Sequence, residues 1–404
     1  MKRKSIEILL IAVSVILLIG CVVIEEAVQP TEAPEGTPYV SASEGEDEAV
    51  GIDEPVLTPE PDVTPTPSPT PEPKNRSQTS GREIPEGTPS RPVILSVENS
   101  DGAKPQTGLM QADIIYEFMV ESAITRFQVL FNDTYPAYAG PVRSVRYYFV
   151  DLAQEWDCMY LHLGGVTLDA PYKRNPKKVI SIYPQNSDER RFYGFTATYV
   201  PQKGDMNDMS VTNGYRFRST KRESPHNLYF LINRMVQKFY GNHTAQICER
   251  FQFMEGVHYE FGETFEMVSM PFLNAGKPEW IQFRYDKDSN RLLRYENGLP
   301  FMTLTPSEDG KTVMEEQMNV QNLIVQHTEY GKVPQDYKGR RTCELTGSGK
   351  CDFFINGQHL TGTWSRPTLE DYTVYMQDNG ELVILEPGNT WIAVHPTSTQ
   401  ITIK

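Results

Sequence analysis

Charged side chains that could bind a ligand gather in one stretch of the chain. Glu117 and Glu121 have even spacing, so we expect both on one face of a strand. Arg143 and Arg146 follow Gly140-Pro141 and are three residues apart, which predicts two guanidinium groups on one side of a helix start. Free N–H groups at a helix start favour an anion, and two arginines would hold a phosphate or carboxylate through paired hydrogen bonds. The pattern indicates an anion-binding site.

Two other interpretations of the arginines stay open. Arg143 or Arg146 would pair with Glu117 or Glu121 as a structural ion pair, or both arginines would be solvated. The positive end of a helix dipole disfavours an arginine that has no partner. The candidate ligand-binding residues are Glu117, Glu121, Thr125, Arg126, Arg143, Ser144, Arg146, His162, His226 and Asn227.

Catalysis is the alternative to binding. Glu117 or Glu121 would act as a general base and His226 as an acid, and paired carboxylates would also suit glycoside hydrolysis. A lone histidine on a strand, such as His162, is more often a hydrogen-bonded core residue than a catalyst. The chain contains no HExxH, GxSxG, Walker, SxxK or zinc-ligand motif. Catalytic residues therefore stay unassigned, and we expect no metal and no cofactor.

The composition excludes several classes of protein. The chain has 404 residues, a formal net charge of −15 and a mean hydropathy of −0.46. Thirteen Asp or Glu residues and no Lys or Arg lie between residues 25 and 73, so the acidity belongs to one segment. No basic stretch suits nucleic acid, and the single apolar segment excludes a protein with several membrane spans.

The N-terminus has the pattern of a bacterial lipoprotein signal. Lys2-Arg3-Lys4 precedes an apolar run from Ile8 to Ile19, and Gly20 comes directly before Cys21. This looks like a lipobox, which implies a signal peptide over residues 1–20 and a diacylglyceryl group on Cys21 that anchors the mature chain by acyl chains such as palmitate. An uncleaved signal anchor is the alternative. Both place the rest of the chain outside the cytoplasmic membrane, so the membrane is one expected partner.

Residues 21–90 are predicted to be a disordered tether. They are rich in Pro, Thr and Glu and nearly free of aromatic residues, so they cannot bury enough apolar surface to fold. Alternating prolines favour an extended chain that would reach on the order of 200 Å.

The remaining residues predict an α+β fold in two parts. Residues 91–255 are expected to form a mixed α/β domain with strands at 92–97, 112–120, 124–131 and 158–163, a helix opened by Pro141 and a second helix at 227–240. Residues 265–404 are expected to form a small, mainly antiparallel β domain, because short β-rich runs alternate there with Gly, Asn and Asp turns. Its strands are expected at 280–285, 292–295, 322–327, 351–355, 373–376, 381–385 and 390–394. Cys343 and Cys351 flank a glycine turn, and whether they form a disulfide is open.

Several motifs together resemble the YerB-type family of bacterial lipoproteins over about residues 88–400. They are Arg91-Pro92-Val93-Ile94, Lys104-Pro105-Gln106, Tyr116-Glu117, Ile124-Thr125-Arg126, Gly140-Pro141-Val142-Arg143-Ser144-Val145-Arg146, His162-Leu163-Gly164-Gly165, Pro225-His226-Asn227, Gly362-Thr363-Trp364 and Pro387-Gly388-Asn389-Thr390-Trp391. The family tends to have glycines where this chain has Ser122-Ala123. The resemblance implies a two-domain architecture and an envelope location, in a family of uncharacterised function.

We therefore expect a membrane-anchored extracytoplasmic lipoprotein. The favoured role is a binding module for an anionic cell-envelope component or an exported partner protein. The alternative is an envelope hydrolase or transferase that uses the Glu, His and Arg cluster of the N-terminal part.

Overall fold

The structure is a computed structural model in which residues 70–404 form one compact unit. The described residues are 75–121, 124–164, 198–200, 204–205, 214–240, 242–246, 248–272, 280–333, 336 and 339–404. The predicted signal peptide, Cys21 and the tether as far as residue 74 lie outside them. Across these described ranges, no helix is long and apolar enough to cross a membrane.

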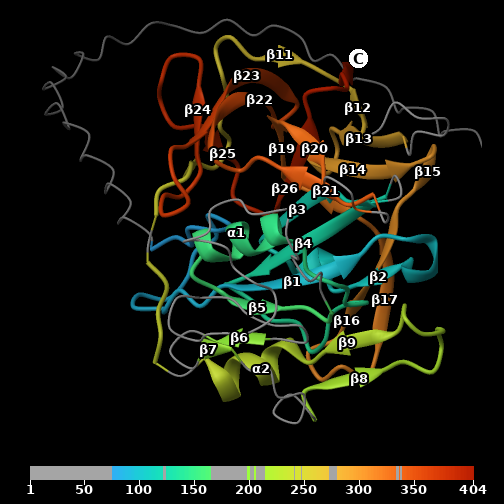
Figure 1. Cartoon of the computed structure of the whole chain (residues 1–404). Helices are drawn as coiled ribbons and strands as arrows, with labels where there is room; N and C mark the ends of the chain where they lie inside the picture. The colour runs from blue at the N-terminus through green and yellow to red at the C-terminus, as the bar shows by residue number, and fades with distance from the viewer. Residues whose placement is uncertain are drawn as a thin grey trace, which may run out of the picture. The chain divides into compact units, whose positions relative to one another are not determined.

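A long mixed sheet is the framework of this unit (Figure 1). Within the described residues it has twelve strands, with β24 (Val374–Gln377) attached beside β23. The other strands follow one another in the order β11 (Glu263–Thr264), β23 (Gln358–Arg366), β22 (Gly347–Ile355), β19 (Asn322–Thr328), β26 (Thr390–Pro396), β3 (Ile114–Met119), β4 (Thr125–Phe131), β1 (Val93–Glu98), β5 (Met159–Leu161), β6 (Thr198–Val200) and β7 (Gly204–Asp205).

The two predicted parts of the chain share this sheet. β3 pairs in parallel with β26, from Ile114 opposite Thr390 to Phe118 opposite Val394. β26 is also parallel to β19, whereas β4 is antiparallel to both β3 and β1. The prediction of an α/β part followed by an antiparallel part is therefore corrected to one mixed, strand-rich framework. Local patterns reveal strands but not their distant partners. The domain bounds at 91–255 and 265–404 stay a prediction.

Each face of the sheet carries its own apolar core, because successive strand residues point to opposite faces. In β1, Val93 and Leu95 belong to one core and Ile94 to the other. α1 (Tyr147–Glu155) covers the Ile94 face, and α2 (Ile232–Phe239) packs against the Val93 face.

A second sheet also covers the Val93 face. It consists of β15 (Leu299–Pro300), β14 (Arg291–Glu296), β13 (Trp280–Asp286), β12 (Met267–Pro271) and β27 (Thr402–Ile403), with β18 (Asn319–Val320) beside β14. Smaller sheets are β17 (Val313–Gln317) with β16 (Met302–Pro306) and β2 (Gln106–Thr107), β10 (Gln252–Phe253) with β25 (Ile384–Leu385), β20 (Tyr330–Lys332) with β21 (Arg341–Cys343), and β8 (Arg216–Arg218) with β9 (Leu228–Phe230). Two 3-10 turns cover Asp101–Ala103 and Leu109–Gln111.

The predicted strands match the structure more closely than the predicted helix starts do. Every strand predicted before residue 164 and in the C-terminal part overlaps a strand of the structure. α1 begins at Tyr147, not at Pro141, because the preceding backbone pairs with β1 instead: Glu98 N donates to Pro141 O and Arg143 N to Ser96 O. The segment predicted as a helix from Asn227 starts with the strand β9, and α2 follows.

Cys343 and Cys351 do not face each other in the ladders. Cys343 of β21 lies opposite Tyr330, and Cys351 of β22 lies opposite Gln326 and Gly362. The strands that hold them belong to different sheets.

The predicted tether is too long at its C-terminal end. Residues 75–90 lie against the folded unit, and Ser77, Thr79 and Ser80 are buried there. Ser77 donates a hydrogen bond to Asp133 and Thr79 donates one to Asp113. In the sequence these small hydroxyl residues look like part of the low-complexity tether. In the structure, Ser77 and Thr79 each donate a hydrogen bond to a carboxylate far along the chain.

Candidate functional site

The predicted polar cluster is divided among three places in the structure. Glu117 and Thr125 lie on the face of the sheet that meets the second sheet. Glu121, Arg126, Ser144 and Arg146 gather near the start of α1. Arg143 and His226 meet at the end of β1. The even spacing of Glu117 and Glu121 does not bring them together, because β3 ends at Met119.

Glu117 is fully buried and receives three donors. Thr125 Oγ1 donates to its Oε1 over 2.6 Å, Arg294 Nη2 to the same oxygen over 3.2 Å, and Trp391 Nε1 to its Oε2 over 3.1 Å. Burial raises the pKa of Glu117, and Arg294 opposes that shift. A carboxylate enclosed in this way cannot approach a substrate, so the general-base role predicted for Glu117 has no support in this geometry.

Arg294 is the centre of this buried network. Its guanidinium carbon lies 3.9 Å from the ring centre of Phe301 and 5.0 Å from that of Trp391. Its Nη1 also donates to Glu296 over 3.2 Å, and Lys104 pairs with the same carboxylate. The aromatic faces attract the guanidinium and shield it from water, which makes the network a structural one.

Glu121 and Arg146 form an ion pair at the start of α1. Arg146 donates Nε–H to Glu121 Oε2 over 2.9 Å and binds Oε1 as well, while Arg126 Nη2 lies 3.9 Å from Oε1. Burial alone raises the pKa of Glu121, but Arg146 and Arg126 outweigh it and lower the pKa to about 2. One of the open interpretations, structural pairing of Arg146 with Glu121, is therefore confirmed.

Arg143 pairs with a residue that sequence reasoning missed. Its Nε lies 2.9 Å from Glu98 Oε1, and His226 Nδ1 lies 2.9 Å from Glu98 Oε2. Ser100 donates to the same carboxylate over 2.8 Å. Glu98 is the last residue of the mainly apolar strand β1, and a carboxylate at that position was the signal available in the sequence.

The other candidates hold the backbone in place. His162 is buried, its Nδ1 lies 2.9 Å from Gly164 O, and burial lowers its pKa to about 4. Asn227 donates to the carbonyls of Ser219 and Arg222 and so closes the β8–β9 turn. Ser144 accepts a hydrogen bond from Arg126 through its carbonyl.

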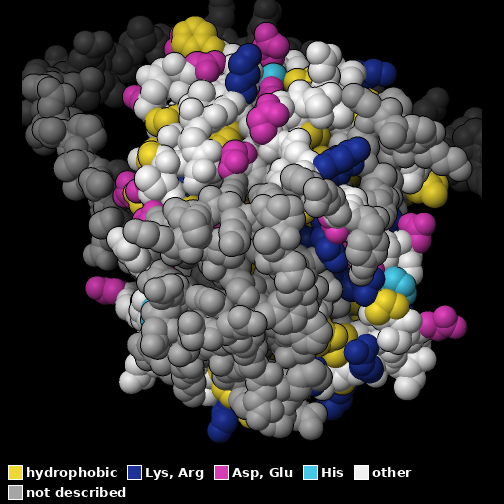
Figure 2. Space-filling model, viewed as in Figure 1, with side chains coloured by type: hydrophobic (Ala, Val, Ile, Leu, Met, Phe, Trp, Pro, Cys, Tyr) yellow, Lys and Arg dark blue, Asp and Glu magenta, His cyan; other side chains and the backbone are white. Residues whose placement is uncertain are grey.

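An open cavity of about 960 Å³ lies at the far end of the long sheet. We call it the sheet-face cavity. Figure 2 shows acidic side chains on the upper part of the visible face, over β22 and β23. The cavity is lined by His327, Thr328, Glu329, Glu344, Thr346, Ser348, Gly349, Lys350, Cys351, Asp352, Thr361, Gly362, Thr363, Trp364, Asp378, Thr397, Thr399, Gln400 and Ile401.

Strand register explains why polar residues gather in this cavity. Along β22, Phe354 and Asp352 lie on the same face, and their partners on β19 are Leu323 and Val325. Leu323, Val325 and Phe354 belong to the core beneath the second sheet. Beyond Asp352 the same face becomes polar, with Lys350 opposite Thr363 of β23. The sheet is apolar where it is covered and polar where the cavity opens.

Asp352 connects two histidines on neighbouring strands. His327 Nε2 lies 2.6 Å from its Oδ2, and His359 Nε2 lies 2.8 Å from its Oδ1. Burial raises the pKa of Asp352, but the two imidazoles outweigh this and lower the pKa to about 2. Because an ionised carboxylate only accepts hydrogen bonds, each Nε2 is the donor in these two contacts.

Two other acidic side chains of the cavity, Glu329 and Asp378, accept hydrogen bonds from threonine hydroxyls. Thr397 Oγ1 donates to Glu329 Oε1 over 2.5 Å, and Thr361 Oγ1 donates to Asp378 Oδ2 over 2.5 Å. Neither carboxylate has an ion pair with a Lys or Arg in the described part of the chain. The lining contains four Asp or Glu residues and a single lysine, Lys350.

Two glycines let the cavity wall form. A Cβ on Gly349 would lie 2.4 Å from Trp364 Nε1 and 2.7 Å from the carbonyl oxygen of His327. The missing side chain allows Trp364 to cross β22 and donate its indole N–H to His327 O over 2.8 Å. A Cβ on Gly362 would lie 2.1 Å from Met376 O.

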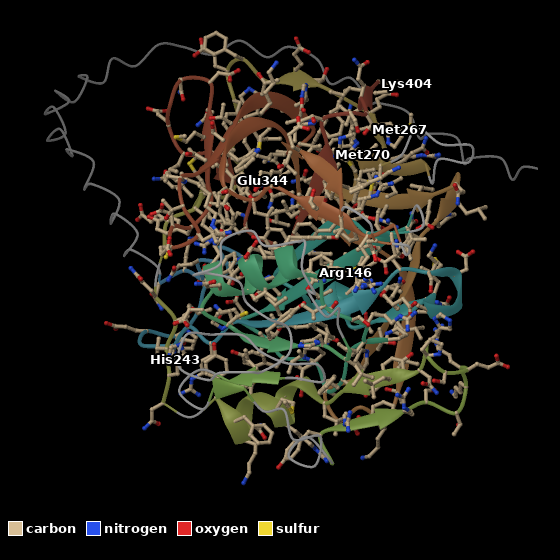
Figure 3. The ribbon with its side chains drawn as sticks, viewed as in Figure 1. Arg146, His243, Met267, Met270, Glu344 and Lys404 are labelled. Carbon is tan, nitrogen blue, oxygen red and sulfur yellow. The ribbon has the colours of Figure 1, made fainter. Side chains whose placement is uncertain are left out.

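The cavity and the predicted arginine site lie at different heights in the molecule. Figure 3 labels Glu344 in the upper half of the ribbon and Arg146 near its centre, beside α1. In the described ranges, no three His, Cys, Asp or Glu side chains are grouped so that they could hold a metal ion.

Comparisons with known proteins agree with the architecture. Residues 79–245 match the N-terminal domain, and residues 268–392 the C-terminal domain, of the family described as "Protein of unknown function (DUF3048)". The chain is 27% identical over 313 residues to the Bacillus subtilis (strain 168) protein named "Putative lipoprotein YerB", which covers 76% of this chain and 82% of that protein. The crystal structure of YerB from Bacillus subtilis is similar with a TM-score of 0.62 at 24% identity, over 82% of this chain and all of that one.

Proposed function

The chain belongs to the DUF3048 family, whose function is unknown, and we propose that it is an envelope binding protein whose ligand occupies the sheet-face cavity. The observation that carries the proposal is the polar end of the β19–β22–β23 face, which the second sheet leaves uncovered. Hydroxyl and carboxylate side chains converge there around an open volume large enough for a small ligand.

The N-terminal sequence supports an anchored, extracytoplasmic location for this binding role. The lipobox pattern that ends at Cys21 and the lipoprotein name of the relative agree with each other. We propose that acyl chains on Cys21 hold the protein at the outer face of the membrane, and that the Pro-rich segment lets the folded unit reach the wall.

The proposed ligand class differs from the anion that the arginines suggest. Arg146 is paired with Glu121, and Arg143 is paired with Glu98, so neither guanidinium is available without breaking an ion pair. The cavity offers more carboxylates than cations, which disfavours an anionic wall polymer in it. We therefore propose a neutral or cationic component of the envelope as the ligand.

Co-sedimentation with purified cell wall tests this function. The folded unit, residues 70–404, is compared with the variant Thr363→Trp, which places an indole in the cavity from an exposed strand position. The matched control is Thr264→Trp, an exposed threonine on β11 of the same sheet and outside the lining. We expect wild type and control to sediment and Thr363→Trp to remain in solution. Equal sedimentation of all three proteins would exclude the cavity as the binding site.

One observation favours hydrolysis as a second candidate function. Asp352 fixes His327 in the form whose Nδ1 can accept a proton, and such a pair in an open cavity is suited to activating water. The hydrolase predicted around Glu117 and His226 would then use His327 and Asp352 instead. Release of soluble reducing sugar from purified wall, lost in His327→Gln, is the expected result. If the wild type releases no sugar, hydrolysis is excluded and binding remains the proposed function.

A further inference from the structure

Glu329 and Asp378 of the sheet-face cavity are exposed, and their partners differ from those of several enclosed carboxylates that pair with arginine. Glu117, Glu121 and Glu98 each contact an arginine. Glu155 contacts two, because Arg250 and Arg366 both lie within ion-pair distance of it. Glu329 and Asp378 instead receive only a threonine hydroxyl each among the described residues. A hydroxyl donates one proton and leaves the negative charge of the carboxylate uncompensated.

The single lysine of the lining does not neutralise these charges. Lys350 is exposed on β22 opposite Thr363, and no ion pair joins it to a carboxylate among the described residues. Counting only the Asp, Glu and Lys side chains, the four carboxylates and Lys350 give the lining a formal charge of −3. A concave, negatively charged site concentrates cations and repels anions.

Hydroxyl groups form the second chemical feature of the cavity. Ser348 and Thr363 are exposed on the two strands of the β22–β23 hairpin, and Thr397 and Thr399 belong to the segment that follows β26. The exposed hydroxyls of Ser348 and Thr363 can each donate and accept a hydrogen bond. Thr397 donates to Glu329 and can still accept, whereas the buried Thr399 hydroxyl bonds to Pro396 O. The exposed groups suit a ligand that carries many hydroxyl groups of its own. The two features together describe a ligand that is both hydroxylated and cationic.

We propose that the sheet-face cavity binds an amino-sugar oligosaccharide whose amine is protonated, which rests on the proposed binding function of the same cavity. The threonine and serine hydroxyls contact the sugar hydroxyls. Glu329 and Asp378 hold the ammonium groups through charge-assisted hydrogen bonds, which are stronger than those between neutral groups.

Two oligosaccharides with the same sugar backbone, one with free and one with acetylated amines, test the proposal. The probes are a chitosan tetramer, which carries free amines, and a chitin tetramer, in which the same amines are acetylated. Titration calorimetry of residues 70–404 is carried out at a mildly acidic pH, where the amines are protonated and the carboxylates remain ionised. We expect chitosan to bind more tightly than chitin, and its affinity to fall as salt is added.

Variants assign the effect to the two carboxylates. Glu329→Gln and Asp378→Asn keep the size of each side chain and remove its charge, and each is expected to weaken chitosan binding by about fivefold. Chitin binding should be unchanged in both. Asp288→Asn is the matched control, because Asp288 is an exposed acid in the turn between β13 and β14 and outside the lining.

The outcomes separate this inference from the proposed function. If both tetramers bind equally and Thr363→Trp blocks both, the cationic class is wrong while the cavity remains a binding site. If neither tetramer binds, the amino-sugar class is wrong. The binding function is then decided separately, by comparing how much Thr363→Trp and Thr264→Trp sediment with purified cell wall. Loss of chitosan binding in Asp288→Asn as well would show a non-specific charge effect and would also overturn the proposal.

Discussion

Glu117 and Asp378 are both acidic residues beside the long sheet, but their surroundings are opposite. Glu117 is enclosed by Arg294, Thr125 and an indole N–H, and the arginine is itself enclosed by aromatic rings. Asp378 lines an open cavity and receives a threonine hydroxyl. The first carboxylate is bound fully within the fold, whereas the second retains bonding capacity for another molecule. The two acids therefore differ both in their partners and in their exposure, although they are the same type of side chain.

The largest expected effect is at the buried pair. Arg294→Met removes the cation and leaves Glu117 charged in the interior, so we expect the free energy of unfolding to fall by about 3–5 kcal/mol. Urea denaturation followed by tryptophan fluorescence measures it. The double variant Glu117→Gln/Arg294→Met removes both charges and should recover much of the loss. A single variant as stable as wild type would show that the pair is not buried as described.

A smaller effect is expected at the partly buried pair beside α1. Arg146→Ala should lower stability at neutral pH by about 2 kcal/mol, since it removes two charged hydrogen bonds from Glu121. The pKa of Glu121 is lowered from 4.5 to about 2, so its contribution is present above pH 4.5 and is lost as the pH falls through about 2. Acid unfolding of Arg146→Ala should lack this step, and an unchanged acid profile would contradict the pairing.

The opposite pH dependence is expected at Asp113. Burial and the neighbouring Asp133 raise the pKa of Asp113 from 3.8 to about 7. The folded state therefore holds a proton that the unfolded state has released, and stability falls as the pH rises from about 3.8 to about 7. Asp113→Asn should remove this decline and, above pH 7, stabilise the protein by on the order of 1 kcal/mol. Thermal unfolding across this pH range checks the sign, and a steeper decline in the variant would refute it.

The smallest expected effect on stability is at the two carboxylates of the cavity, Glu329 and Asp378. Glu329→Gln and Asp378→Asn should change the free energy of unfolding by less than about 0.5 kcal/mol, because both acids are exposed and no arginine of the described residues pairs with either carboxylate. A cost similar to that of Arg294→Met would show that these acids are structural. Differential scanning calorimetry of the same samples used for the binding titrations provides the measurement.

Local patterns in the sequence predict the strands, but not what the strands bring together. The local patterns placed strands where β3 and β4 lie, and a helix in the region where α1 lies. The helix start at Pro141 was wrong because that backbone pairs with β1, which no local rule reveals. Glu117 finds its partner Arg294 on a strand 177 residues further along the chain.

The cavity was not predicted either, because its lining residues also come from segments that are distant in the sequence. Its walls come from β19, β22, β23 and the segment after β26, and only the sheet order makes them neighbours. Asp352 and His327 are unremarkable in sequence, because they lie in alternating strands like many polar residues around them. Their register across β19 and β22, which depends on long-range pairing, creates the contact.

The docked segment at residues 75–90 has a mechanical consequence. Thr79 bonds to Asp113 at the start of β3, and Ser80 accepts a hydrogen bond from Gly388 N, two residues before β26. β3 and β26 are the parallel neighbours that join the N-terminal and C-terminal halves. A pull on the chain from its N-terminal side would therefore reach both halves at their common seam and load them together.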